Sequence, residues 1–474
     1  MPAPGSNVSS LSLPKAKRPQ WPEITWDFSK ARQDGPKILG VNPWITDFAA
    51  YNLWARPTGL LACLETLRSS GAGIALLDCL DPTWQETTWP RRTPYGCGPY
   101  PRTPLPVPSF LAHLPRQFSR YGLPYTAVQG ALARLNPPPD LILLTTPMTY
   151  WYPGTVQALT LLRRLWPRVP IALGGVYPTL CPEHAADFGA DLVLGGPLED
   201  SENWQSLWRL LDAEAPPLPP QAGFRLALDL YAEPAFAPIL GSRGCPYNCE
   251  YCASHQLYPA FAQRPCASVW SEFAAQYAAG VRDFAFYDDA LLLNPRAWLF
   301  PFLQHVQTLP EPVRLHTPNA MHVQALTPEI CRALFQAGLT TIRLGLESGD
   351  FDNRLDTKLS AQQWRHGVEN LFAAGFRPRD ISAYILFGLP DQNEREIRSA
   401  ARLAAASGIR PQLAHFSPLP GTSLFERAVQ VSPWPLTEEP LCHNNSIWPC
   451  VPGGFSWKTK RCWQETLAQT MTDY

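Results

Sequence analysis

Three cysteines lie within a stretch of eight residues in the segment GSRGCPYNCEYCASH. They are Cys245, Cys249 and Cys252, and they form a C-x3-C-x2-C arrangement directly after an apolar run. Three thiolates on one loop can bind three irons of a cubane cluster and leave the fourth iron without a protein ligand. The spacing therefore predicts a 4Fe-4S cluster with one open, reactive iron.

A structural zinc site is the main alternative for these cysteines. Structural zinc usually takes four ligands, typically as two closely spaced pairs, and the other nine of the 12 cysteines are scattered singly along the chain. The pattern therefore favours the cluster. Cys442, Cys450 and Cys462 are too widely spaced to predict a second cluster, and we expect them to be buried or free thiols.

Apolar runs separated by helical segments follow the cysteines and predict the elements that position them. The expected strands are 238–244, 282–289, 313–318, 341–348, 382–388 and 412–418. Six βα units predict a partial (β/α)6 barrel, in which the carboxyl ends of the strands face one site. Asp288, Asp289, Glu347 and Ser348 lie at such ends, whereas His316 and Asn319 fit a structural role equally well.

The N-terminal half shows an earlier series of the same kind. Apolar runs at 37–43, 73–80, 140–147, 169–175 and 190–197 alternate with helical segments and predict a Rossmann-like doubly wound parallel sheet. The fold class is thus α/β, with this sheet followed by the barrel. Ligands of such sheets bind at the carboxyl ends of the strands, where Gly174-Gly175 and Gly195-Gly196 would let them approach the backbone. A dinucleotide is excluded because no G-x-G-x-x-G follows the first strand.

Proline-rich stretches indicate the domain boundaries. We expect an N-terminal extension over 1–35, the Rossmann-like domain over 36–212, a linker over 213–235, the barrel over 236–430 and a C-terminal extension over 431–474.

The bulk composition limits the partners. A net charge of −1 gives no basic field for nucleic acid, and no run of apolar residues is long enough to span a membrane. The first residues lack the apolar core of a signal peptide, and we therefore expect a cytoplasmic protein.

Residues 237–430 resemble the radical S-adenosylmethionine superfamily, on the cysteine motif and on the segments FAFYDDALLLN, RLGLESG, ILFGLPDQNERE and SPLPGTSLFERA. The resemblance implies that S-adenosylmethionine chelates the open iron and is cleaved to a 5′-deoxyadenosyl radical. It places Asp288 and Asp289 near the methionine amino group, and Glu347 and Ser348 near the ribose or methionyl portion. Tyr251 matches the aromatic residue usual before the last cysteine.

The segments 40–61, 144–154, 173–184 and 191–197 resemble the cobalamin-binding domain that precedes many such barrels. The resemblance implies that Gly174 and Gly175 lie near the nucleotide tail, and that Thr145, Thr146 and the loop 148–152 lie near the corrin. The aromatic residues of that loop are equally expected in interdomain packing. The D-x-H-x-x-G motif is absent, and His184 stands in a different context. Many members of this enzyme branch lack the motif and bind cobalamin without a histidine from the protein, and the alternative is a Rossmann-like domain that is retained without a ligand.

Together the two resemblances imply a cobalamin-dependent radical methyltransferase that acts on an unactivated carbon and receives electrons from a donor such as flavodoxin or ferredoxin. The alternatives are a non-methylating rearrangement, cyclisation or methylthiolation enzyme, and a non-catalytic metal-bound scaffold. The sequence does not identify the substrate.

Overall fold

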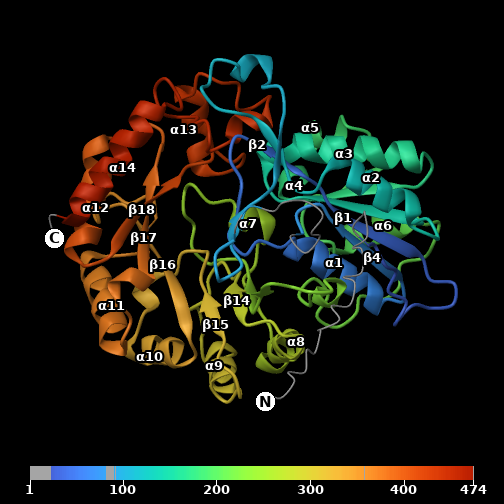
Figure 1. The fold of residues 1–474 in the computed structure, drawn as a ribbon, viewed down its shortest axis with the longest axis horizontal. Coiled ribbons are helices and arrows are strands. Elements are labelled where there is room, and N and C mark those ends of the chain that lie inside the picture. Colours follow the sequence, from blue (N-terminus) through green and yellow to red (C-terminus); the bar gives the residue numbers. More distant parts are fainter. Residues whose placement is uncertain (1–22, 82–89, 91, 357, 473–474) are drawn as a thin grey trace, which may run out of the picture.

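The computed structural model describes residues 23–472, apart from 82–89, 91 and 357. Most of the expected N-terminal extension, residues 1–22, therefore lies outside the described part of the chain. Two parallel sheets stand side by side, the first built from the N-terminal half and the second from the residues after it (Figure 1). The expected α/β fold class, a Rossmann-like sheet followed by a partial barrel, is confirmed.

The first sheet has five parallel strands in the order β10-β9-β8-β1-β4. Their bounds are β1 Lys37–Asn42, β4 Gly73–Asp78, β8 Leu141–Thr146, β9 Ile171–Gly175 and β10 Leu192–Val193. All five expected strands are thus present. The order reverses between β1 and β8, which is the kind of point at which ligands bind in such sheets.

Helices cover both faces of this sheet, because successive strand residues point to opposite sides. On β1, Ile38 packs with Leu64 of α1, while its neighbour Leu39 packs with Leu162 of α3. The helices are α1 Thr58–Ser69, α2 Tyr125–Arg134, α3 Tyr152–Leu165, α4 Val176–Leu180, α5 Pro182–Ala186 and α6 Ser201–Arg209. Smaller antiparallel pairings involve β2 Ile45–Asp47, β3 Tyr51–Asn52, β5 Gly98–Pro99, β6 Arg102–Pro104 and β7 Ser119–Tyr121.

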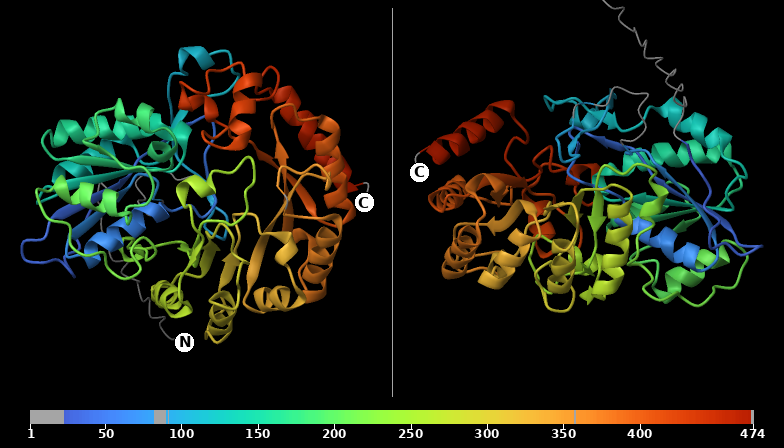
Figure 2. Two further views of the ribbon diagram at one scale, coloured as in Figure 1. Left: turned by 180° about the vertical axis from the view of Figure 1, so that it is seen from behind. Right: turned by 60° about the horizontal axis from the view of Figure 1, so that its bottom comes forward.

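The second sheet has six parallel strands in sequence order, from β11 at one edge to β18 at the other. Their bounds are β11 Ala237–Ile239, β14 Asp283–Phe286, β15 Arg314–His316, β16 Leu339–Glu347, β17 Ile381–Phe387 and β18 Arg410–His415. The sheet curves into an open barrel with helices on its outer side (Figure 2). The short pair β12 Ser242–Arg243 and β13 Ala262–Gln263 and the helix α7 Ser254–Leu257 lie between the first two strands in the chain.

Five helices lie on the outer side of the second sheet. They are α8 Cys266–Ala278, α9 Leu299–Gln307, α10 Pro328–Gln336, α11 Ala361–Ala374 and α12 Glu394–Ala406. All but α9 are followed by a glycine with positive φ, a conformation that glycine adopts without steric cost: Gly280, Gly338, Gly375 and Gly408.

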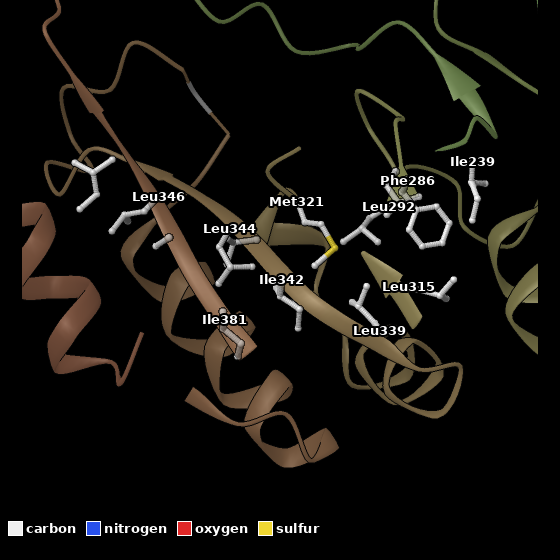
Figure 3. Close-up of a cluster of buried hydrophobic side chains, with 14 of the residues drawn as sticks. Ile239, Phe286, Leu292, Leu315, Met321, Leu339, Ile342, Leu344, Leu346 and Ile381 are labelled. Carbon is white, nitrogen blue, oxygen red and sulfur yellow. The ribbon is translucent and has the colours of Figure 1, made fainter. Parts of the chain in front are cut away.

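Buried aliphatic and aromatic side chains join the strands to the helices in one core (Figure 3). On β16, Ile342, Leu344 and Leu346 have no exposed surface and belong to this core. The residues between them on the strand point to the inner side of the barrel, where the strands' polar side chains gather.

The C-terminal segment contains α13 Ser423–Val431 and α14 Trp457–Thr472. Helix α14 lies along α12 on the outer side of the barrel, and the stretch before it reaches the N-terminal half (Figure 1). Asn444 donates a hydrogen bond of 2.8 Å to Asp47, and Trp457 donates one of 2.6 Å to the carbonyl oxygen of Pro115. The segment therefore braces the two halves against each other.

In the described part of the chain, every helix is too short or too polar to serve as a membrane span.

Candidate functional site

The three motif cysteines lie on the loop between β12 and α7. Gly244 precedes the first of them with φ of +76°, and a Cβ atom there would lie 2.7 Å from the carbonyl oxygen of Ala260. The backbone amide of Cys252 bonds to the carbonyl oxygen of Cys249 at 3.0 Å, which turns the loop back on itself. Cys249 is buried, Cys245 is half-buried and Cys252 is exposed, so the loop presents thiols to a partly open space.

The three thiols influence one another electrostatically, which indicates that they lie near each other. Burial, with the charges of Asp289 and the other two cysteines, raises the pKa of Cys245 to about 11. Burial also raises the pKa of Cys249, and the ammonium group of Lys358 opposes this shift. Three thiolates on this loop would therefore repel one another, and bound cationic irons would relieve that repulsion.

No three His, Cys, Asp or Glu side chains within the described ranges are grouped as the ligands of a single metal ion would be. Thiolates bound to three different irons of a cubane stand farther apart than the ligands of one ion. The three cysteines on one loop thus suit a multi-iron cluster by number and chemistry.

A polar network holds the cysteine loop against the segment after β16. Tyr251 donates a hydrogen bond of 3.0 Å to Asp356 and receives one of 3.3 Å from Lys358. The amide of Glu250 bonds to the carbonyl oxygen of Leu355 at 3.1 Å. The loop is therefore fixed from the side on which β16 ends.

The two adjacent aspartates at the end of β14 hold the other side of the loop. Asp288 accepts hydrogen bonds from the Ser242 hydroxyl at 2.6 Å and from the Gly241 amide at 3.3 Å, and burial raises its pKa to about 7. Asp289 accepts a hydrogen bond of 3.1 Å from the Gly244 amide. Asp289 thus lies next to the first cysteine, while the oxygens of Asp288 are directed to β12.

Glu347 and Ser348, the predicted residues at the end of β16, line a cavity of about 180 Å³. Glu347 is buried with φ of +61°, and its Oε1 lies 3.8 Å from Nζ of Lys358. Burial raises the pKa of this carboxyl group, and Lys358 opposes the shift. Tyr251 and residues of the segment 385–392 at the end of β17 also line the cavity, so it joins the motif loop to the end of this strand.

A second cavity, of about 110 Å³, opens at the carboxyl ends of β8 and β9. Of the residues that the sequence assigned to cobalamin, Thr145, Gly174 and Gly175 line this cavity. Thr146 does not line it, because it is buried and its hydroxyl lies 2.6 Å from that of Thr155. The apolar part of the lining comes from Leu60, Ala62, Leu143, Ala172, Leu194 and Leu198. Glycine backbone and aliphatic side chains suit a flat apolar ring system such as the nucleotide base of cobalamin.

Several lining residues of this second cavity were not expected from the sequence. Gly59 of α1 lies on one side, and Arg243 and Tyr258 reach it from the barrel. Arg243 pairs with Glu199 and donates a hydrogen bond of 2.8 Å to the carbonyl oxygen of Gly223. Gly59 and Arg243 stand in segments that the sequence analysis used, but nothing in those segments assigns them to this cavity, because the three residues come from distant parts of the chain.

The aromatic loop 148–152 takes the packing role that was the alternative for it. Tyr152 donates a hydrogen bond of 2.9 Å to Glu439, and the Thr149 hydroxyl lies 3.0 Å from Nδ1 of His443. His184 lies 2.6 Å from the hydroxyl of Tyr177, and His316 is fully buried between Asp283 and Thr341. These contacts give structural roles to both histidines.

Comparisons with known proteins agree with this arrangement. Residues 239–404 match the model of the radical SAM superfamily. An uncharacterized methyltransferase of Pyrococcus horikoshii is 25% identical over 199 residues, which are 41% of this chain and 42% of the relative. The bacteriochlorophyllide d C-12(1)-methyltransferase of Chlorobaculum tepidum is 24% identical over 281 residues, 54% of this chain and 59% of the relative. The chain thus spans about half the length of these curated relatives.

The fold is similar to that of TsrM, a radical S-adenosylmethionine methyltransferase of Kitasatospora setae. A structure of TsrM with cobalamin and a 4Fe-4S cluster matches with a TM-score of 0.60 and 16% identity, over 85% of this chain and 80% of that one. A structure with tryptophan substrate and an S-adenosylmethionine analogue matches equally well, over 78% of its chain. At this identity the likeness concerns the fold.

Proposed function

Because residues 239–404 match the model of the radical S-adenosylmethionine superfamily, we propose that the chain is a cobalamin-dependent methyltransferase of this superfamily that acts on an unactivated carbon. One observation carries the proposal: the two candidate cofactor sites meet at the cysteine loop. Arg243, two residues before Cys245, lines the N-terminal cavity, and α7, two residues after Cys252, packs against α4. The loop that would hold a cluster therefore lies between the two sheets, where Figure 1 shows α7.

The candidate site residues have separate roles in this proposal. Cys245, Cys249 and Cys252 would hold a 4Fe-4S cluster, and Asp289, Glu347 and Ser348 would contact S-adenosylmethionine, with Asp288 supporting the loop from behind. When bound, these groups supply one-electron cleavage of the cosubstrate and a carrier for its methyl group. Gly174 and Gly175 would border the nucleotide tail of cobalamin and Thr145 the corrin, while Thr146 would stabilise this part of β8 through its contact with Thr155.

The fit of the residues to these groups rests on features of the structure itself. The Glu347 carboxylate is buried beside Lys358 at the mouth of a cavity and has room to accept hydroxyl hydrogen bonds. The walls of the N-terminal cavity include two glycines that carry no side chain to obstruct a planar ligand: a Cβ atom would meet nothing within 4 Å at Gly59, and only Leu194, at 3.9 Å, at Gly174.

We further propose the domain division 1–35, 36–212, 213–235, 236–430 and 431–474. It is supported by the first sheet, whose strands run from residue 37 to 193, and by the second, whose strands run from 237 to 415. The protein would work in the cytoplasm with a donor such as flavodoxin or ferredoxin. All 12 cysteines are unpaired, as is usual in a reducing compartment.

A non-methylating radical reaction on the same scaffold is the second candidate. The methyltransferase names of both curated relatives favour methyl transfer over it.

The test is anaerobic reconstitution with iron, sulfide and cobalamin, followed by incubation with S-adenosylmethionine and a reductant. We expect about four irons per chain, retained cobalamin, and formation of both S-adenosylhomocysteine and 5′-deoxyadenosine. The triple variant Cys245→Ala, Cys249→Ala, Cys252→Ala should lose the iron, while Cys442→Ala, Cys450→Ala, Cys462→Ala should keep it. Deoxyadenosine without S-adenosylhomocysteine would leave the non-methylating candidate, and failure to retain cobalamin would remove the N-terminal site.

A further inference from the structure

The inner face of the barrel is partly open along its last three strands. On β16, β17 and β18 the side chains alternate between the covered outer face and this inner face. Ile342, Leu344, Ala383 and Ile385 are fully buried on the outer face, as Figure 3 shows for the first two. The inner face carries partly exposed side chains, namely Thr341, Arg343, Tyr384, Leu386 and Gln412.

Arg343 is a cation on this inner face without an acidic partner. Among the described residues of 236–430, the other arginines that are not exposed each lie within 4.0 Å of a carboxylate oxygen: Arg243, Arg264, Arg282, Arg314, Arg354 and Arg398. For Arg343 the described part of the chain supplies no such oxygen. A partly buried guanidinium without an acidic partner costs free energy unless another group supplies a negative charge or hydrogen-bond acceptors.

The hydrogen bonds of Arg343 leave some of the N–H donors of its guanidinium unused. Its Nη1 donates to the carbonyl oxygen of Ile342 at 3.3 Å, and the guanidinium lies within hydrogen-bonding reach of the Tyr384 hydroxyl. Its Nε is buried and has no hydrogen-bond partner in the described structure. The planar fork of an arginine matches a carboxylate with two parallel hydrogen bonds.

The position of Arg343 connects it to the candidate active site. Arg343 and Glu347 both belong to β16, and a bulge interrupts the strand between Gly345 and Glu347. Oε1 of Glu347 lies 2.9 Å from the place that a Cβ atom of Gly345 would take, which is on the face that carries Arg343. Tyr384 donates a hydrogen bond of 3.2 Å to the carbonyl oxygen of Pro318, which holds its hydroxyl beside the guanidinium. A small molecule bound between Arg343 and Glu347 would have one end at Arg343 and the other near the cosubstrate.

We propose that Arg343, with Tyr384 beside it, binds the carboxylate group of a small organic acid, and that the substrate of this protein therefore carries a carboxylate. This inference rests on the proposed function for its substrate, but the anion site itself does not require turnover. The Nη groups of the guanidinium donate to the carboxylate oxygens, which neutralises the charge.

The test uses three matched pairs of probes, each an acid and its uncharged primary amide: benzoate and benzamide, 3-phenylpropionate and 3-phenylpropanamide, indole-3-acetate and indole-3-acetamide. Binding to the reconstituted full-length protein is measured by saturation-transfer NMR and calorimetry. At least one acid should bind about tenfold more tightly than its amide, because a charge-assisted pair replaces a neutral contact. Arg343→Gln should abolish this preference, and Arg343→Lys should retain part of it.

Arg402→Gln, which removes an exposed arginine of α12 on the outer side of the barrel, is the matched control and should preserve the preference for acids. Tyr384→Phe should weaken the preference while leaving the arginine in place, which covers the case that Arg343→Gln folds poorly. Equal binding of acids and amides to the wild type, absence of acid binding, or an unchanged preference in Arg343→Gln would each overturn the proposal. Iron and cobalamin content of the same samples report separately on the proposed function.

Discussion

The carboxylate of Asp288 receives a hydrogen bond of 2.6 Å from the Ser242 hydroxyl, and this contact joins the end of β14 to the strand just before the cysteine loop. The second oxygen of Asp288 accepts from the Gly241 amide at 3.3 Å. Because Asp289 holds the Gly244 amide in the same way, two adjacent carboxylates clamp the loop over four residues. The start of the cysteine loop is thus set by the second strand of the barrel.

Asp288→Asn should reduce the pH dependence of stability. Burial raises the pKa of Asp288 to about 7 from its ordinary value near 4, so the fold prefers the protonated form. The stabilising contribution is complete below about pH 4 and is lost as the pH rises through about 7. Between about pH 5 and pH 8 the wild type should lose up to about 2–3 kcal/mol more than the variant, measured by urea unfolding. Asp352→Asn, at an exposed position, should retain the wild-type dependence, and parallel curves for Asp288→Asn and the wild type would contradict the assignment.

Gly59→Leu should prevent cobalamin retention without harming the barrel. Gly59 lines the N-terminal cavity, and a Cβ atom there meets nothing within 4 Å, so the longer side chain can occupy the space without backbone strain. We expect retention of cobalamin to fall at least about tenfold by absorbance after gel filtration, with iron content unchanged. Gly59→Ala is the control: it should bind normally and gain up to about 1 kcal/mol of stability from helix propensity. Normal retention of cobalamin by Gly59→Leu would show that cobalamin does not bind in this cavity.

The architecture was predictable because buried parallel strands appear in the sequence as near-continuous runs of apolar residues. KILGVN, LILLTT and ISAYILF each became a strand of the expected sheet, and glycines such as Gly375 marked the helix ends between them. The cysteine motif needed no three-dimensional information, because its spacing alone gives three ligands on one loop.

The sequence could not show which of two neighbouring residues in a strand faces a binding site. Thr145 and Thr146 are adjacent on β8, so they point to opposite faces: Thr145 lines the cavity, and Thr146 bonds to Thr155. The sequence does not say which face is which. Residues that reach a site from a distant segment, such as Arg243 at the N-terminal cavity, carry no local signal at all.

Asn444→Ala should destabilise the joint between the C-terminal segment and the N-terminal half. Asn444 is fully buried, donates to Asp47 at 2.8 Å and accepts from the Ser446 amide at 2.7 Å. Removing its amide leaves a buried carboxylate with one donor fewer, at a cost of about 1–3 kcal/mol. The free energy of unfolding in urea measures the loss. Gln205→Ala, on the exposed side of α6, should change it by less than about 0.5 kcal/mol, and an equally small effect at Asn444 would argue against the brace.

Glu347→Gly should separate stability from cosubstrate binding. Glu347 has φ of +61°, a conformation that costs a non-glycine residue about 1–2 kcal/mol and that persists where the side chain is needed. Glu347→Gly and Glu347→Gln both remove the charge, but only glycine relieves the backbone, so the glycine variant should be the more stable of the two by about 1 kcal/mol. Calorimetry should find both variants weakened at least about tenfold in S-adenosylmethionine binding, because each loses a charged acceptor at the ribose.

Asp212→Gly is the control for the backbone effect, since Asp212 is exposed and also has positive φ, with a value of +50°. It should match the stabilisation without changing cosubstrate affinity. Wild-type affinity in Glu347→Gly would show that the carboxylate makes no contact with S-adenosylmethionine. A glycine variant less stable than the glutamine variant would show instead that the buried side chain, through Lys358 at 3.8 Å, stabilises the end of β16 more than the strained backbone destabilises it.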